Sequence, residues 1–131
     1  MTKSLEINSK LENINIVEKM IDEIAEELHI SSDIYGKILI AVIEGVNNSI
    51  VHGNKLDSKK KVKICIVSNE DQLQVSIEDQ GLGFDYANVP DPTKPENIEN
   101  ISGRGVFLMQ KLADNYKFLN NGSKVELFFS L

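Results

Sequence analysis

The 131-residue sequence contains little cysteine and little arginine, and its prolines are confined to one segment. Its one cysteine, Cys65, excludes an internal disulfide, which is typical of proteins in a reducing compartment. The formal net charge of −6 argues against a nucleic-acid partner, because binding nucleic acid requires an excess of positive charge. Residues 1–13 are polar and lack an apolar signal core, and we expect no run of transmembrane length. We therefore expect a cytoplasmic protein without a membrane partner.

All three prolines fall in residues 85–102, a segment that is also rich in Asp, Asn and Glu. Structureless segments longer than about 12–15 residues are uncommon in compact domains and are usually lids, binding loops or disordered. We interpret residues 85–102 as a lid. The rest of the sequence contains neither an internal repeat nor a linker, and its length fits one domain with a real core, so we expect a single domain over residues 1–131.

The spacing of apolar residues predicts three helices and five strands. The strands are expected around Leu5 and Ile7 and over residues 61–68, 72–79, 115–120 and 123–130, and the helices over residues 14–29, from 31–33 to 52, and from about 106 to 112. Strands follow one another here without β-α-β crossovers. This order favours an α+β sandwich, with helices layered on one face of a mixed, mostly antiparallel sheet.

The second predicted helix carries a carboxylate, a carboxamide and an imidazole at spacings of four: Glu44, Asn48 and His52. Helical geometry places this trio within an arc of about 80°. An apolar stripe is centred about 170° away, so the trio is predicted to face away from the core contact. The residues of that stripe are Leu39, Ile43, Val46 and Ile50.

A solvated helix face is the simpler explanation for this trio. However, Glu44 is the only charged residue between Ile38 and Val51, and a helix that is apolar nearly all round is normally covered on more than one side. A buried carboxylate without a partner would cost several kcal/mol. We therefore favour a covered polar cluster with a ligand above it, such as a metal ion.

A second group of polar residues begins where the strand 72–79 ends. Asp79 shares the strand parity of the apolar residues before it, so its carboxylate should leave on the core side and needs a hydrogen-bond donor. An adenine amino group is one candidate, and a neighbouring backbone N–H or hydroxyl is the other. The glycines that follow, Gly81 and Gly83, permit either close approach of a ligand or an ordinary turn.

A third group, Gly103-Arg104-Gly105, lies where the predicted lid enters the last helix. Glycines before a helix expose backbone N–H groups, and the helix N-terminus favours anions. Arg104 is the only arginine among 14 basic residues, and its place suggests contact with nucleotide phosphates or an acidic partner. The alternative is a helix capped by Ser102 and followed by an exposed arginine.

Together, Glu-x-x-x-Asn on a helix, Asp-x-Gly-x-Gly, a long lid and Gly-x-Gly-x-x-Leu resemble the GHKL (HATPase_c) ATPase superfamily over residues 5–130. Within it, the short chain and the stretches 44–54 and 103–114 resemble the bacterial anti-sigma-factor serine kinases of the RsbW type. The resemblance implies a Bergerat ATP-binding fold, with ATP between the helix layer and the lid.

The resemblance also implies roles for individual residues. Asn48 matches the ligand of the Mg²⁺ ion that bridges the phosphates, and Glu44 matches the general base of the kinases. Asp79 matches the acceptor of the adenine amino group. His52 and Asn54 match motif positions and receive only a supporting role.

The remaining matches concern glycines and one hydroxyl. Gly81 and Gly83 match glycines that line the base, and Gly103 and Gly105 match lid glycines whose backbone meets the phosphates. Ser123 stands where the family often has threonine, so the hydroxyl that reaches the adenine site is retained without its methyl group.

The implied function is that of a switch kinase that works as a homodimer. It would transfer the ATP γ-phosphate to a serine of a STAS-type anti-anti-sigma protein, sequester a sigma factor, or do both. One alternative is a nucleotide-dependent binding module without kinase activity. Another is an ATPase or histidine-kinase catalytic fragment, which the lack of a phosphoacceptor-histidine hairpin and of a transducer domain disfavours.

Overall fold

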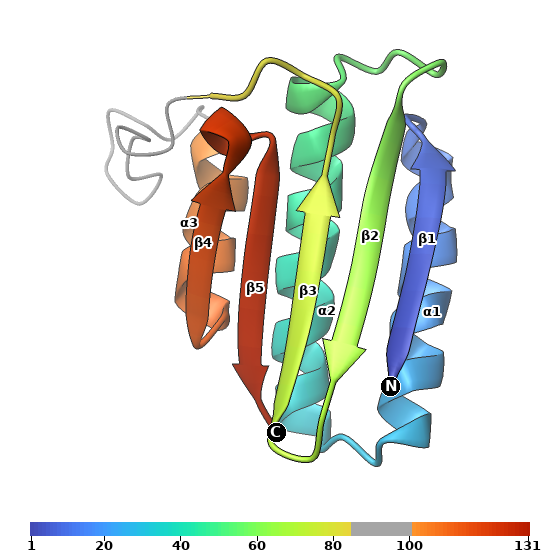
Figure 1. Ribbon diagram of the computed structural model, residues 1–131, viewed down its shortest axis with the longest axis vertical. Helices are drawn as coiled ribbons and strands as arrows, with labels where there is room; N and C mark the ends of the chain where they lie inside the picture. Colours follow the sequence, from blue (N-terminus) through green and yellow to red (C-terminus); the bar gives the residue numbers. More distant parts are fainter. Residues whose placement is uncertain (85–100) are drawn as a thin grey trace.

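The structure, a computed structural model, describes residues 1–84 and 101–131, and of residues 101–103 it describes the backbone alone (Figure 1). The predicted order of elements is confirmed: β1 (Thr2–Asn8), α1 (Ile14–Glu27), α2 (Ser32–Asn48), β2 (Lys61–Ser68), β3 (Gln72–Glu78), α3 (Ile101–Leu112), β4 (Asn115–Leu119) and β5 (Lys124–Ser130). The predicted lid, residues 85–102, lies outside the described residues except for its last two, which belong to α3.

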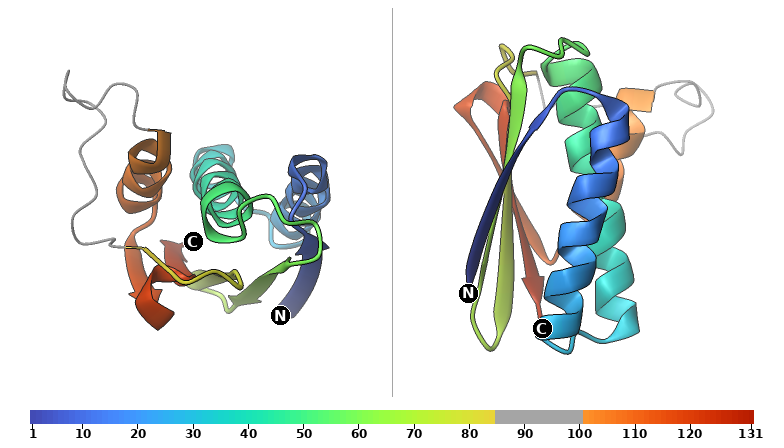
Figure 2. Two further views of the ribbon diagram at one scale, coloured as in Figure 1. Left: turned by 90° about the horizontal axis from the view of Figure 1, so that it is seen from above. Right: turned by 90° about the vertical axis from the view of Figure 1, so that its right-hand side faces the viewer.

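The five strands form one sheet in the order β1-β2-β3-β5-β4. Figure 2 shows the three helices side by side on one face of this sheet, so the predicted α+β sandwich is confirmed. Every pairing among the described strands is antiparallel, whereas a mixed sheet was predicted. Alternation explains the single covered face, because Val62, Ile64 and Ile66 are buried, whereas Lys61 and Lys63 are exposed and Cys65 is partly exposed.

The predicted boundaries of α1 and α2 shift for local reasons. Helix α1 ends at Glu27 instead of His29, and His29 is exposed with a φ of 53°, which a continuing helix does not allow. Helix α2 begins after Ser31, whose Oγ accepts a hydrogen bond from the Ile34 N–H at 3.4 Å and caps the helix.

The end of the α2 segment differs from an ordinary helix. The helical course reaches Gly53, close to the prediction, but after Asn48 it becomes a π-helical turn, Ser49–Gly53. The Asn54 N–H donates to the Ser49 carbonyl at 2.8 Å, a hydrogen bond that spans five residues instead of four. The side chains after Asn48 are therefore rotated relative to their α-helical positions.

The buried face of α2 is not the predicted one. It is formed by Ile38, Ala41, Val42, Gly45 and Val46. Of the predicted stripe, Val46 and Ile50 are buried, while Leu39 and Ile43 are only partly buried. At 100° per residue, the centre of this face lies about 90° from Asn48, instead of the predicted 170°. Because α2 is apolar nearly all round, its pattern does not select one side. The polar residues consequently border the core contact.

The helical run Ser32–Gly53 has 22 residues and contains an 18-residue window with a mean hydropathy of 1.3. By length and composition alone this run could cross a membrane, whereas no run of transmembrane length was expected. Figure 2 shows α2 in the middle of the helix layer, between α1 and α3, with the sheet beneath it. Packing on several sides accounts for its apolar character without a membrane.

Helix α3 begins earlier than predicted, at Ile101, so Gly103 and Gly105 lie inside the helix instead of before it. Val106 and Met109 on α3 are buried, and the Met109 Sδ packs close to Gly45 of α2. This contact places the third turn of α3 beside the C-terminal part of α2.

Two glycines of α2 should respond in opposite ways to alanine. A Cβ on Gly45 would lie 2.7 Å from Ile77 Cδ1 and 3.0 Å from Met109 Sδ, and both side chains are buried, so Gly45→Ala should destabilise the fold by about 1–3 kcal/mol. A Cβ on Gly36 meets nothing within 4 Å, so Gly36→Ala should stabilise it by about 0.5–1 kcal/mol. Urea unfolding measures both changes, and equal signs would contradict this packing.

Candidate functional site

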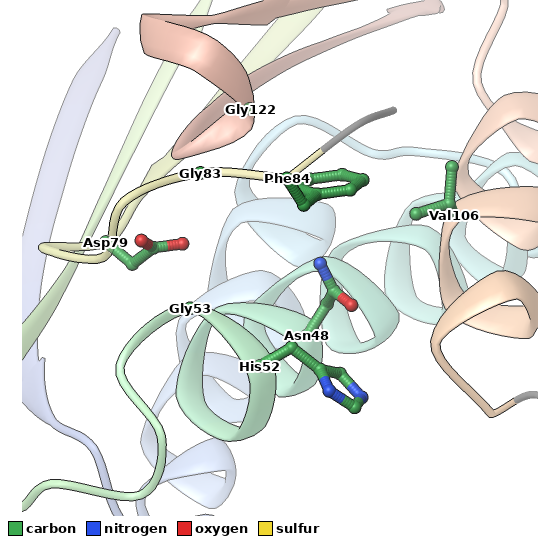
Figure 3. A pocket seen from close by; sticks show the side chains of 8 residues that line it. All are labelled: Asn48, His52, Gly53, Asp79, Gly83, Phe84, Val106 and Gly122. Atoms are coloured by element: carbon green, nitrogen blue, oxygen red, sulfur yellow. The ribbon is translucent and has the colours of Figure 1, made fainter. Parts of the chain in front are cut away.

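A pocket opens where the end of α2, the exit of β3, α3 and the turn Asn120–Gly122 meet (Figure 3). Most of its wall is apolar or glycine, with three polar side chains. The residues that line it are Asn48, His52, Gly53, Asp79, Gly83, Phe84, Val106 and Gly122.

Asp79 is the acidic group of this pocket. It follows β3 directly, and its carboxylate faces the pocket, as the strand parity predicted (Figure 3). Burial raises the pKa of this carboxyl, although hydrogen bonds from the Gly81 N–H and the Ser49 side chain oppose that rise. The bond from Gly81 reaches Oδ1 at 2.8 Å. The pocket therefore holds a half-buried carboxylate that retains capacity to accept a further hydrogen bond.

The glycines around Asp79 are required by contacts within the chain. A Cβ on Gly53 would collide with the Asp79 carboxylate, and a Cβ on Gly81 would collide with the Gly53 carbonyl. Gly83 has a φ of 92°, and a Cβ there would collide with the Asn121 carbonyl. Gly83 lines the pocket as predicted, whereas Gly81 lines an adjoining groove.

Asn48 and His52 approach the pocket from α2 and from the π-helical turn, and Figure 3 shows both beneath Phe84. The Asn48 side chain is half-buried. His52 is more exposed, and partial desolvation lowers the pKa of its imidazole, with a smaller contribution from Lys55 in the same direction. The neutral imidazole is therefore favoured near neutral pH.

Glu44 lies one turn before Asn48 but does not line the pocket. Its Oε2 would lie 3.5 Å from a Cβ placed on Gly105, so the carboxylate sits against the first turns of α3. Glu44 and Asn48 thus both lie along the contact between α2 and α3, here called the α2–α3 seam, with Asn48 at the end near the pocket.

Two of the predicted phosphate-site residues lie differently from the expectation. Gly103 belongs to the first turn of α3, where backbone N–H groups have no partner within the helix. Gly105 is the fifth residue of the helix, so its N–H can bond within it, contrary to the expectation that both glycines precede the helix. Arg104 is exposed on α3.

Ser123 supports the site through its backbone. Its carbonyl accepts the Asp79 N–H at 2.9 Å, while its hydroxyl donates to the Asn120 carbonyl at 2.9 Å. The hydroxyl therefore stabilises the turn before β5. Its predicted contact with a base stays a prediction.

Sequence reasoning missed several residues that build the pocket. Phe84 and Val106 form its apolar walls, and Ser49 donates to Asp79. Phe84 could have been found, because it directly follows the Asp-x-Gly-x-Gly motif. Ser49 could not, because the predicted α-helical period gave no reason to aim it at β3.

Asparagine at position 79 should stabilise the free protein at neutral pH. The pKa of the Asp79 carboxyl is higher in the folded state than its ordinary value of 3.8, so as pH rises the folded state keeps the carboxyl proton longer than the unfolded state does. The free energy of unfolding therefore falls as pH rises from the unfolded-state pKa to the folded-state pKa. Asp79→Asn keeps an acceptor for the Gly81 N–H and removes that cost. The gain in unfolding free energy should vanish below about pH 3.8.

Urea unfolding of ligand-free protein at several pH values tests this expectation. Asp57→Asn is a control, since Asp57 is an exposed carboxylate near the same rim that accepts the Lys59 N–H at 3.0 Å, a bond that asparagine can keep. A neutral-pH loss of stability in Asp79→Asn would refute the cost assigned to the buried carboxylate.

Curated proteins similar to this chain carry two names. An anti-sigma F factor of Clostridium beijerinckii is 32% identical over 128 residues, which cover 93% of this chain and 89% of that protein. A serine-protein kinase RsbW of Bacillus licheniformis is 30% identical over 115 residues, covering 83% and 72%. Similarity thus extends over most of both chains.

A solved structure resembles this fold over 99% of the chain: the RsbU and RsbW domains of a Mycobacterium tuberculosis protein, with a TM-score of 0.65 and 12% identity. The chain spans about a third (32%) of that longer protein, and the likeness concerns the fold alone. The sequence-family model of the histidine kinase-like ATPase domain matches residues 7–129 of this chain. Because that match covers nearly all of the sequence, the chain belongs to the family of histidine kinase-like ATPase domains.

Proposed function

We propose that this protein is an ATP-dependent serine kinase that regulates a sigma factor. It would transfer the ATP γ-phosphate to a serine of a STAS-type anti-anti-sigma protein, sequester a sigma factor, or do both. The observation that carries this proposal is the half-buried Asp79 carboxylate facing an apolar pocket, in a chain whose relatives are named anti-sigma F factor and serine-protein kinase RsbW. We infer a cytoplasmic homodimer that binds neither nucleic acid nor a membrane.

The pocket suits the adenine base of ATP. Asp79 would accept the amino group of the base, while Gly83 and Gly122 leave room for a flat ring and Phe84 and Val106 supply apolar walls. An ionised carboxylate inside such a wall is costly without a donor, so a ligand that carries an N–H donor is favoured. Gly81 would support the base from behind Asp79, and the hydroxyl of Ser123 would support it through the turn.

Magnesium would bind at Asn48, between the base and the α2–α3 seam. Within residues 1–84 and 101–131, no cluster of three His, Cys, Asp or Glu side chains could hold a metal ion. A single amide oxygen still fits Mg²⁺, because this ion takes few protein ligands and completes its octahedron with waters and phosphate oxygens. When bound, the ion would neutralise phosphate charge.

Glu44 would act as the general base. Its carboxylate lies beside Gly105, one turn from Asn48, and the phosphate end of the nucleotide would meet α3 there. There it would take the proton from the attacking serine hydroxyl. The backbone N–H of Gly103, in the first turn of α3, would face the phosphates, and the exposed Arg104 would contact the phosphates or an acidic partner. Gly105, whose N–H can bond within the helix, would leave room for the phosphates beside Glu44.

A binding module without kinase activity is the second candidate. The observation that favours it is that Glu44 does not line the pocket. Such a module would sequester its partner when ATP binds, without transferring phosphate.

Replacing the proposed base separates these two functions. Glu44→Gln should reduce phosphate transfer to a STAS-type protein by roughly 100- to 10,000-fold and leave ATP affinity nearly unchanged. Transfer is measured with labelled ATP, and complex formation is measured separately by gel filtration. Glu26→Gln, which removes an exposed carboxylate from α1, is the matched control.

Equal transfer by wild type and Glu44→Gln would show that Glu44 is not the base. Partner binding without transfer in the wild type would favour the second candidate.

The adenine contact predicts a preference for ATP over inosine triphosphate (ITP), whose ring carries an oxygen in place of the amino group. With Oδ1 held by Gly81, Asp79→Asn would present an amide N–H₂ to the pocket, which opposes an amino group and suits an oxygen. ATP should bind at least about tenfold more weakly, and ITP should gain. Unchanged ATP affinity would refute the role of Asp79.

A further inference from the structure

A fully buried asparagine lies behind the pocket. Asn54 has no exposed surface and forms three side-chain hydrogen bonds. Its Nδ2 donates to Ser9 Oγ at 2.8 Å and to the Lys61 carbonyl at 3.0 Å, and its Oδ1 accepts the Gln80 N–H at 2.8 Å. A backbone donor and a backbone acceptor fix which end of the amide is oxygen, so the orientation of this side chain is unambiguous.

The π-helical turn brings Asn54 to this place. Its N–H donates to the Ser49 carbonyl across five residues, so the two residues lie one above the other on the same side of the turn. In an α-helix, residues five apart differ by about 140°. The turn therefore aims both Ser49 and Asn54 at the exit of β3.

Each N–H of the segment 79–81 has a different partner. The Asp79 N–H donates to the Ser123 carbonyl, the Gln80 N–H to Asn54, and the Gly81 N–H to the Asp79 carboxylate. The middle bond ties the backbone next to Asp79 to the helix layer. The Gln80 side chain adds a bond to the start of β2, because its Oε1 accepts the Lys61 N–H at 2.6 Å.

We propose that Asn54 is a positioning residue, which holds the backbone of Gln80 so that the Asp79 carboxylate points at the amino group of the base. Ser9 and Asn54 are buried and do not line the pocket, so neither would contact the base itself. The inference rests on the proposed ATP site and adds a determinant of its specificity for adenine. Without the bond from the Gln80 N–H, the segment 79–81 keeps its backbone bond to Ser123 and the bond between the Gln80 side chain and Lys61, and it loses this tie to the helix layer.

Ser9 offers a matched control in the same network. Its hydroxyl donates to the Lys60 carbonyl at 2.7 Å and accepts from Asn54, and it is 1% exposed. Ser9→Ala leaves one N–H of Asn54 unpaired and buried but keeps the bond to Gln80. Asn54→Ala removes the bond to Gln80 as well. Both variants should lose stability, and only Asn54→Ala should change base recognition.

The experiment measures the affinities of ATP and ITP for wild type, Ser9→Ala, Asn54→Ala and Asp79→Asn. We expect Asn54→Ala to reduce the preference for ATP over ITP by about tenfold and to leave ITP affinity nearly unchanged. Ser9→Ala should keep the wild-type preference. An intact preference in folded Asn54→Ala, together with its loss in Asp79→Asn, would overturn the positioning role alone.

Two further outcomes complete the test. A wild type without any preference would overturn the adenine assignment and this inference with it. If Asn54→Ala does not fold, amide hydrogen exchange of the wild type decides, because the Gln80 N–H should then exchange far more slowly than an unprotected amide. Exchange at the unprotected rate would overturn the proposal.

Discussion

The site depends on one close approach: the end of the α2 segment presses against the exit of β3 with the Asp79 carboxylate between them. Glycine on both sides makes this approach possible, because a Cβ on Gly53 or Gly81 would collide with that carboxylate or with the opposite backbone. The same contact desolvates Asp79 and raises its pKa. The pocket wall and the chemistry of its acidic group therefore arise from a single packing arrangement.

The half-buried Asp79 carboxylate lowers the stability of the free protein and is suited to binding a ligand with an N–H donor. A carboxylate that remains charged inside an apolar wall costs folding free energy, and the donors from Ser49 and Gly81 offset only part of that cost. A ligand with an N–H donor would offset more of this cost on binding. Under the proposed function, the free protein is destabilised at the place where the ligand would be recognised, so a residue that is unfavourable for the fold would suit the function.

The sequence predicted the fold well because strand alternation, helical periodicity and caps are local signals. It also placed Asp79 on the inner side of the sheet and Glu44 with Asn48 on one side of α2. It misjudged which face of α2 is buried, because that helix is apolar nearly all round and only the sheet selects a side. It missed Phe84 and Val106 as pocket walls, since their neighbours come from segments distant in the chain.

The π-helical turn Ser49–Gly53 could not be predicted from local sequence patterns. A four-residue period made Glu44, Asn48 and His52 equivalent, but Asn48 and His52 line the pocket whereas Glu44 lies against α3. Glu44 and Asn48 stay on the seam with α3, whereas the residues after Asn48 rotate so that Ser49 and Asn54 face β3. One additional residue in the turn divides the segment into a part that faces α3 and a part that holds Asp79. Under the proposed function, this division would let a single helix contact both ends of the nucleotide.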